Sequence, residues 1–162
     1  MSRSRVGVFV VMGLGGVLQR HRRGACTYDG LMRHALLQRL LDLELPRGDW
    51  ALFGSGSLLA RGWIDDVGDL DVIVRGAAWE AVQALGRTVH LSEHDVDVVV
   101  VDDRITFGTR WGIGSFDTGE LIDTAEEVDG IPCVRTEHVV AYEPIAGRPK
   151  DTIHLAVIEA WS

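Results

Sequence analysis

Hydrophobic and polar positions follow two periods along the chain. Leucines recur every three to four residues between positions 31 and 41, which predicts an amphipathic helix that begins near Asp29 and ends before Pro46. Short apolar runs predict strands at residues 51–53, 70–74, 96–101 and 105–107. Further helices are predicted at residues 55–60, 77–85, 118–124, 136–142 and 148–161. The order predicts an α/β (α+β) domain with one mixed central sheet flanked by helices.

Composition and charge narrow the class of protein. The 162 residues are 46% hydrophobic, which suits a single globular domain that we place at residues 26–162. The net charge is −8 and Lys150 is the sole lysine. Proteins that bind nucleic-acid backbones are usually basic, so this balance argues against nonspecific nucleic-acid binding. A small nucleotide held through a metal ion remains compatible with it.

The first 25 residues differ from the rest. An apolar run at residues 6–18 lies between two arginines and the basic cluster at residues 20–23. It is too short to span a bilayer comfortably, and it ends in positive charge where a signal peptide would have small residues. We expect an extension outside the domain, with initiation nearer Met32 as one explanation and secretion as the alternative. Cys26 and Cys133 lack CxxC spacing, which favours reduced thiols and a cytoplasmic protein.

Asp69 and Asp71 form a candidate metal site. Residues i and i+2 of a strand point to the same face, so both carboxylates project together. A divalent cation would relieve their repulsion, and Mg²⁺ in nucleotide sites takes one or two carboxylates plus phosphate oxygens. The alternative is an edge-strand pair in plain solvent.

A glycine and a serine precede this pair. Gly54 and Ser55 end one predicted strand and open a helix, where glycine permits close backbone approach and helix amides favour an anion. The alternative is an ordinary turn with a serine cap. We expect strands 51–53, 70–74 and 96–101 to be adjacent, so that a phosphate held at Gly54–Ser55 faces the carboxylates.

The stretch "FGSGSLLARGWIDDVGDLDVIV" resembles the signature of the DNA polymerase beta-like nucleotidyltransferase superfamily, with Gly54, Ser55, Asp69 and Asp71 at the matching positions. The downstream "GRPKDTIHLAVIEAW" is similar to the C-terminal helix of minimal, single-domain bacterial members. The resemblance implies the nucleotidyltransferase fold. It also implies transfer of a nucleoside monophosphate from a nucleoside triphosphate to an acceptor, with two Mg²⁺ ions held by three acids.

The third acid departs from the family pattern. The matching position is Thr106, so we expect Asp97 to substitute, with the solvent face of its strand as the alternative. Arg61 is the expected basic contact to phosphate. If no third acid converges, the runner-up is a catalytically decayed module that acts through nucleotide or protein contacts, for example in a toxin–antitoxin or defence pair. The residues do not identify the acceptor.

Overall fold

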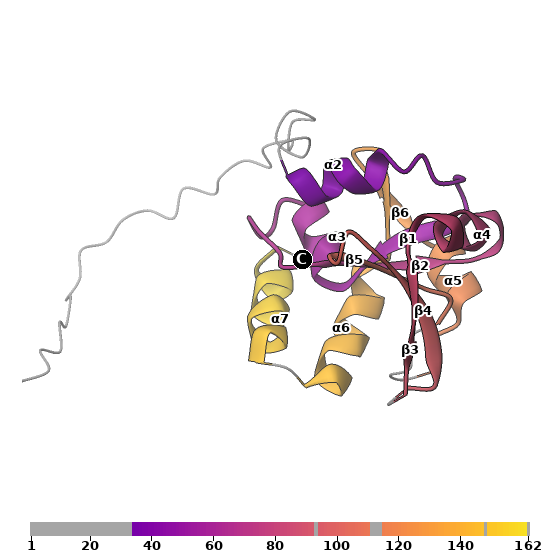
Figure 1. Cartoon of the computed structure of the whole chain (residues 1–162). Coiled ribbons are helices and arrows are strands. Elements are labelled where there is room, and N and C mark those ends of the chain that lie inside the picture. The colour runs from indigo at the N-terminus through magenta and orange to yellow at the C-terminus, as the bar shows by residue number, and fades with distance from the viewer. Residues whose placement is uncertain (1–33, 93, 111–114, 148, 162) are drawn as a thin grey trace, which may run out of the picture.

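The computed structural model describes residues 34–92, 94–110, 115–147 and 149–161, which fold into a seven-stranded mixed sheet with six helices (Figure 1). The strands are β1 (Trp50–Phe53), β2 (Leu70–Val74), β3 (Arg87–Leu91), β4 (Val96–Val101), β5 (Ile105–Gly108), β6 (Glu126–Val128) and β7 (Ile131–Cys133). The helices are α2 (Ala35–Leu41), α3 (Gly54–Ala60), α4 (Gly76–Leu85), α5 (Thr118–Asp123), α6 (Thr136–Ala146) and α7 (Pro149–Trp161). The expected mixed α/β class is confirmed. The extension at residues 1–25, the helix start expected near Asp29 and Cys26 lie outside the described residues.

The strand order is β3-β4-β5-β2-β1-β7-β6. β1 pairs with β2 in the antiparallel sense and with β7 in the parallel sense, while β2 and β5 are parallel. The expected adjacency of β1 and β2 is confirmed. The expectation that β4 also lies beside β2 is wrong, because β5 turns back from β4 and inserts between the two strands.

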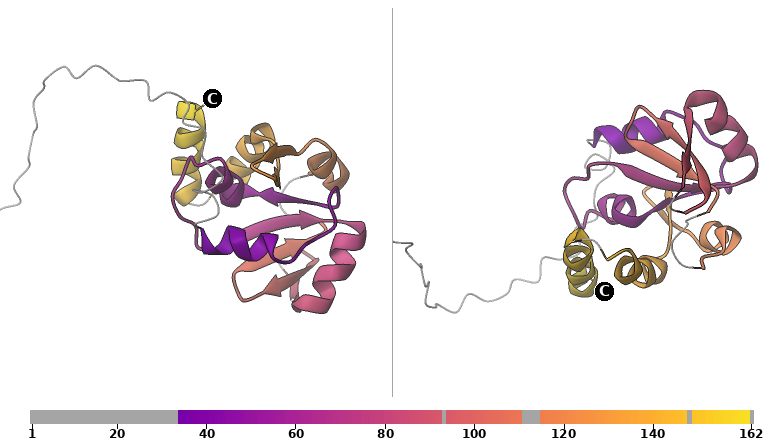
Figure 2. Two further views of the ribbon diagram at one scale, coloured as in Figure 1. Left: turned by 90° about the horizontal axis from the view of Figure 1, so that it is seen from above. Right: turned by 60° about the horizontal axis from the view of Figure 1, so that its bottom comes forward.

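Each face of the sheet carries its own layer of apolar side chains. Leu52, Val72 and Phe107 point to one face, where they pack with buried residues of α2 and α4. Ala51 and Ile73 point to the other, where they pack with residues of α5 and α6. Figure 2 shows α2 and α4 on one side of the sheet and α5 and α6 on the other, with α7 beside α6. In the part of the chain that the structure describes, no helix is long and apolar enough to cross a membrane.

Helix α7 has a buried side and an exposed outer side. The buried side carries Asp151, His154 and Ile158. Its outer side carries Ile153, which is 64% exposed. Trp161, which is 58% exposed, follows His154 by two turns and stacks on Trp63, with ring centroids 6.4 Å apart.

Three short strands are absent from the sequence-based expectations. β3 lies at a sheet edge with most of its residues exposed, so it lacks the alternation that marks a half-buried strand. β6 and β7 form a hairpin of three-residue strands. The cap of α5 is Asp117, whose side chain accepts a hydrogen bond from the Glu120 amide at 2.8 Å, and Thr118 is the first helical residue.

Gly86 tests the packing of α4 on β4. A Cβ at this position would lie 2.5 Å from Cγ1 of Val99 and 2.7 Å from the carbonyl oxygen of Val100. We predict that Gly86→Ala lowers the free energy of unfolding by about 1–3 kcal/mol, because both neighbours belong to a central strand. Gly68→Ala is the control, since nothing lies within 4 Å of its Cβ. Urea unfolding measures both, and equal stability of the two variants would contradict the packing.

Candidate functional site

A single row of paired residues crosses the sheet at the candidate site. Asp71 of β2 pairs with Phe53 at the end of β1 and with Thr106 of β5, and Thr106 pairs in turn with Val100 of β4. Paired residues in adjacent strands project to the same face. The row therefore has one carboxylate, one hydroxyl and two apolar side chains. Asp69 precedes β2 by one residue and is exposed, while Asp71 is half-buried.

The first turn of α3 directly follows the end of β1 that pairs with Asp71. Because Phe53 pairs with Asp71 in the antiparallel sense, the chain after Phe53 runs beside the residues before Asp71. Gly56 packs on the opposite face of the sheet, since a Cβ on it would lie 2.8 Å from Cδ1 of Leu52 and 3.1 Å from Cδ2 of Leu70, which both belong to the core cluster of α2 and α4. The pairing of Phe53 with Asp71 thus brings the backbone of the strand end and the turn beside the backbone of the carboxylate pair.

The turn itself depends on Gly54 and Ser57. Gly54 has a φ of +56°, the left-handed region that favours glycine, and nothing lies within 4 Å of its Cβ position. The requirement is therefore one of backbone conformation and not of space. The hydroxyl of Ser57, which is fully buried, donates a hydrogen bond to the Gly54 carbonyl oxygen at 2.8 Å. Ser55 lies within the first turn and does not cap the helix.

Asp97 does not join Asp69 and Asp71. Val99 pairs with Phe107 and shares the face of Val72, and Asp97 lies two residues from Val99 on the same strand. Alternation therefore places Asp97 on the face opposite to Asp71. Its carboxylate contacts Nδ1 of His90 at 2.9 Å on the neighbouring edge strand, and both side chains are largely exposed. The expectation that Asp97 supplies the third acid is wrong in geometry.

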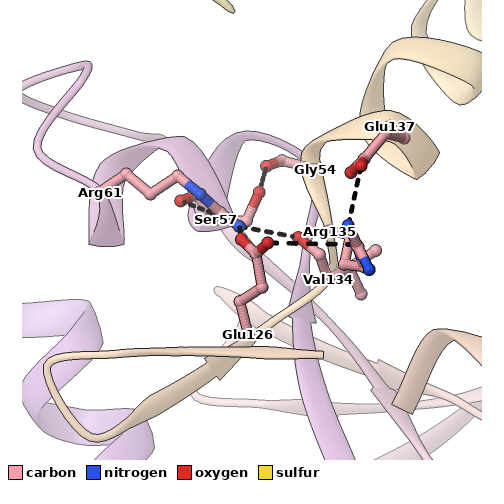
Figure 3. A network of polar contacts seen from close by, with 7 residues as sticks. All are labelled: Gly54, Ser57, Arg61, Glu126, Val134, Arg135 and Glu137. Atoms are coloured by element: carbon pink, nitrogen blue, oxygen red, sulfur yellow. Dashed lines mark hydrogen bonds and ion pairs between the residues drawn. The ribbon is translucent and has the colours of Figure 1, made fainter. Parts of the chain in front are cut away.

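Arg61 also has a different role from the one expected. Its side chain is 7% exposed, pairs with Glu126 at 2.9 Å and donates hydrogen bonds to the carbonyl oxygens of Ser57 and Val134 (Figure 3). Its guanidinium also lies 5.7 Å from the ring centre of Trp63. These contacts fasten α3 to the β6–β7 hairpin. The guanidinium is committed to them, so the expectation that Arg61 is a phosphate contact is wrong.

The loop before Asp69 is acidic and is held by two basic side chains. His34 contacts Asp66 at 3.1 Å. This hydrogen bond, with a second from the Val67 amide, lowers the pKa of the Asp66 carboxyl. Arg104 donates from Nε to the Gly68 carbonyl oxygen at 2.9 Å and from Nη2 to that of Val67 at 3.3 Å. Side chains from two other segments of the chain thus hold the loop that leads into Asp69 and Asp71.

Ser57 and Arg104 are the site residues that sequence reasoning missed. Ser57 is one of several small residues in "GSGSLLA", and only its complete burial distinguishes it. Arg104 lies 36 positions from Gly68, so the pattern near either residue holds no signal of their contact. The sequence feature that could have drawn attention to Arg104 is its position directly after the Asp102–Asp103 turn.

The donor set fits one divalent cation better than two. Within the described ranges, no group of three or more histidine, cysteine, aspartate or glutamate side chains could hold a metal ion. Asp69 and Asp71, with the Thr106 hydroxyl in the same row, match the one or two carboxylates with which Mg²⁺ is usually held. Cys133 offers no ligand, because burial raises the pKa of its thiol to about 12.

Comparison with known proteins adds no relative. No protein-family model matches the chain, and neither a curated protein nor a solved structure shows significant similarity to it.

Arg61 provides a test of the site's scaffold. We predict that Arg61→Met lowers the free energy of unfolding by about 2–3 kcal/mol, because it removes the side-chain hydrogen bonds to the Ser57 and Val134 carbonyl oxygens and the ion pair with Glu126. Arg47→Met is the matched control, since Arg47 is 76% exposed and contacts Glu127 at 3.4 Å. Exposed pairs contribute roughly 0–1 kcal/mol. If both variants unfold at the same urea concentration, Arg61 is not the tie that its contacts indicate.

Proposed function

We propose that the protein is a nucleotidyltransferase that transfers a nucleoside monophosphate from a nucleoside triphosphate to an acceptor hydroxyl with Mg²⁺. The observation that carries the proposal is the antiparallel pairing of Asp71 with Phe53, the residue that directly precedes Gly54 and Ser55. The backbone at Gly54–Ser55 and the two carboxylates thus border the same end of the β1–β2 pair. The resemblance of the same residues to the nucleotidyltransferase signature supports it.

The proposed reaction makes one bond and breaks one. The acceptor oxygen bonds to the α-phosphorus, the bond from that phosphorus to the bridging oxygen breaks, and pyrophosphate leaves with its electron pair. The acceptor proton passes to water. Mg²⁺ bound by Asp69 and Asp71 would neutralise phosphate charge. The chain's own contribution is positioning, since Gly54 and Ser55 would hold phosphate oxygens through backbone amides.

A catalytically decayed module is the second candidate. It is favoured by Thr106, which occupies the row of Asp71 where the family pattern has an acid, and by the position of Asp97 on the other face. The exposed apolar side chains of α7, Ile153 on its outer side and Trp161 stacked on Trp63 at its end, suit contact with a protein partner. Such a partnership would fit a cytoplasmic toxin–antitoxin or defence pair.

Nucleotide binding tests the carboxylate pair. We predict that a nucleoside triphosphate with Mg²⁺ raises the melting temperature, because a ligand at 100 times its Kd stabilises the folded state by about 2.7 kcal/mol. The response should vanish in Asp69→Asn/Asp71→Asn and persist in Asp97→Asn, which removes a charge on the opposite face. Thermal unfolding with each nucleotide measures it. A full response in the double variant would contradict the proposed clamp.

Thr106 tests the number of metal ions. We predict that Thr106→Asp adds a second Mn²⁺ equivalent, because the new carboxylate would stand beside Asp71 in the same row. The matched control is Thr88→Asp, the same change at an exposed residue of β3 that pairs with Val99 and therefore lies on the opposite face. Equilibrium dialysis counts the bound ions. An unchanged number in Thr106→Asp, with the fold intact, would show that the row does not converge on a metal.

A further inference from the structure

Arg104 touches the chain on both sides of Asp69. Its guanidinium donates to the carbonyl oxygens of Val67 and Gly68, which precede Asp69. Its own carbonyl oxygen accepts a hydrogen bond from the Leu70 amide at 2.9 Å, directly after Asp69. One residue of the β4–β5 hairpin therefore fixes the backbone before and after this carboxylate.

Arg104 is itself held in place. It follows a tight turn in which Asp102 and Asp103 have φ values of +52° and +56°, and its amide donates to the Val101 carbonyl oxygen at 3.2 Å. Two successive residues with positive φ are typical of the two-residue turns that join antiparallel strands. The Asp102 carboxylate accepts a hydrogen bond from Nε of Arg39 in α2 at 2.5 Å. The turn is thus tied to the helix layer.

We propose that Arg104 is a positioning residue that sets the direction of the Asp69 carboxylate for a divalent cation. The inference rests on the proposed function and names a residue that the nucleotidyltransferase resemblance does not assign. Gly68 has no Cβ contacts and belongs to the residue type with the greatest backbone freedom. A planar guanidinium with two donors in fixed geometry restricts that freedom before the cation arrives.

Charge and position act in opposite directions at this residue, which makes the inference testable. The cationic guanidinium near the site opposes the binding of a second cation, so loss of its charge alone would strengthen metal binding. Loss of positioning would weaken it. Arg104→Gln removes the charge, whereas Arg104→Lys keeps the charge and replaces the planar fork with a single ammonium group.

Mn²⁺ is the probe, measured by the electron paramagnetic resonance signal of the free ion during titration of the full chain. We expect both Arg104→Lys and Arg104→Gln to weaken Mn²⁺ binding about tenfold, as changes to groups that orient metal ligands commonly do. Arg87→Gln is the control. It removes a 69% exposed arginine that contacts Asp103 of the same turn at 3.8 Å but has no contact with the Val67–Gly68 carbonyl groups. Its Mn²⁺ affinity should stay at the wild-type value.

Two further measurements separate position from stability. Thermal unfolding in a chelator identifies any variant that has lost its fold, and Arg104→Lys is the milder change if Arg104→Gln unfolds. In an Asp69→Asn background, Arg104→Lys should have no further effect on Mn²⁺ binding, because the carboxylate that it orients is gone.

The results distinguish the inference from the proposed function. If the wild type binds Mn²⁺ through Asp69 and Asp71 but folded Arg104→Lys binds it equally well, the positioning role is overturned and the proposed function stands. Tighter binding by Arg104→Gln with unchanged Arg104→Lys would assign Arg104 a charge effect only and would also overturn the role. If the wild type binds no more Mn²⁺ than Asp69→Asn/Asp71→Asn, both proposals fail.

Discussion

The register between β1 and β2 is the constraint on which the candidate site depends. Phe53 opposite Asp71 places the end of β1 at the start of β2, and a shift by one residue would turn Asp71 toward the α2–α4 layer. The register is held because both faces are packed. Leu52 and Val72 belong to one core cluster, and Ala51 and Ile73 belong to the other. Packing on both faces of the strands thus fixes the register, and the register fixes the position of the half-buried Asp71 carboxylate.

Arginines hold the segments around this pair. Arg61 joins α3 to the β6–β7 hairpin, and Arg104 joins the β4–β5 turn to the loop before β2. Arg75 pairs with Asp123 of α5 at 2.6 Å and donates to the Gly48 carbonyl oxygen. Each of the three donates to backbone carbonyl groups of a segment distant in sequence. In this acidic chain with one lysine, the three arginines donate hydrogen bonds to backbone carbonyl groups. The electrostatic potential around the carboxylates of the candidate site therefore stays negative.

Sequence patterns predicted the local parts of the structure well. The strand predicted at residues 70–74 has the observed bounds, and the helix predicted at 77–85 begins one residue late. Both predictions succeed because the hydrophobic pattern of each element reflects which of its own residues are buried. β3 was missed because an edge strand exposed on both faces has no alternating pattern. β6 and β7 were too short to show any period.

The errors at the candidate site have a common physical origin. Asp97 was assigned to it because alternation along β4 gives two faces but not which of them is shared with β2. That depends on β5, which inserts between the two strands and transmits the register from Asp71 through Thr106 to Val100. Arg61 was assigned to phosphate because it follows the Gly-Ser turn closely in sequence. Its partners Glu126 and Val134 lie 65 and 73 positions away.

The parallel pairing of β1 with β7 has a consequence for how the chain folds. Leu52 pairs with Cys133, roughly 80 positions later, whereas β4 and β5 are joined by a short turn. Closing so long a loop costs conformational entropy before the contacts between the paired strands can stabilise it. The β6–β7 hairpin therefore adds to a sheet whose other strands can already have paired, and until it does the edge of β1 offers open hydrogen-bonding groups. Synthesis proceeds from the N-terminus, so a nascent chain carries that open edge until β7 has emerged, and during this interval β1 is open to pairing with another molecule.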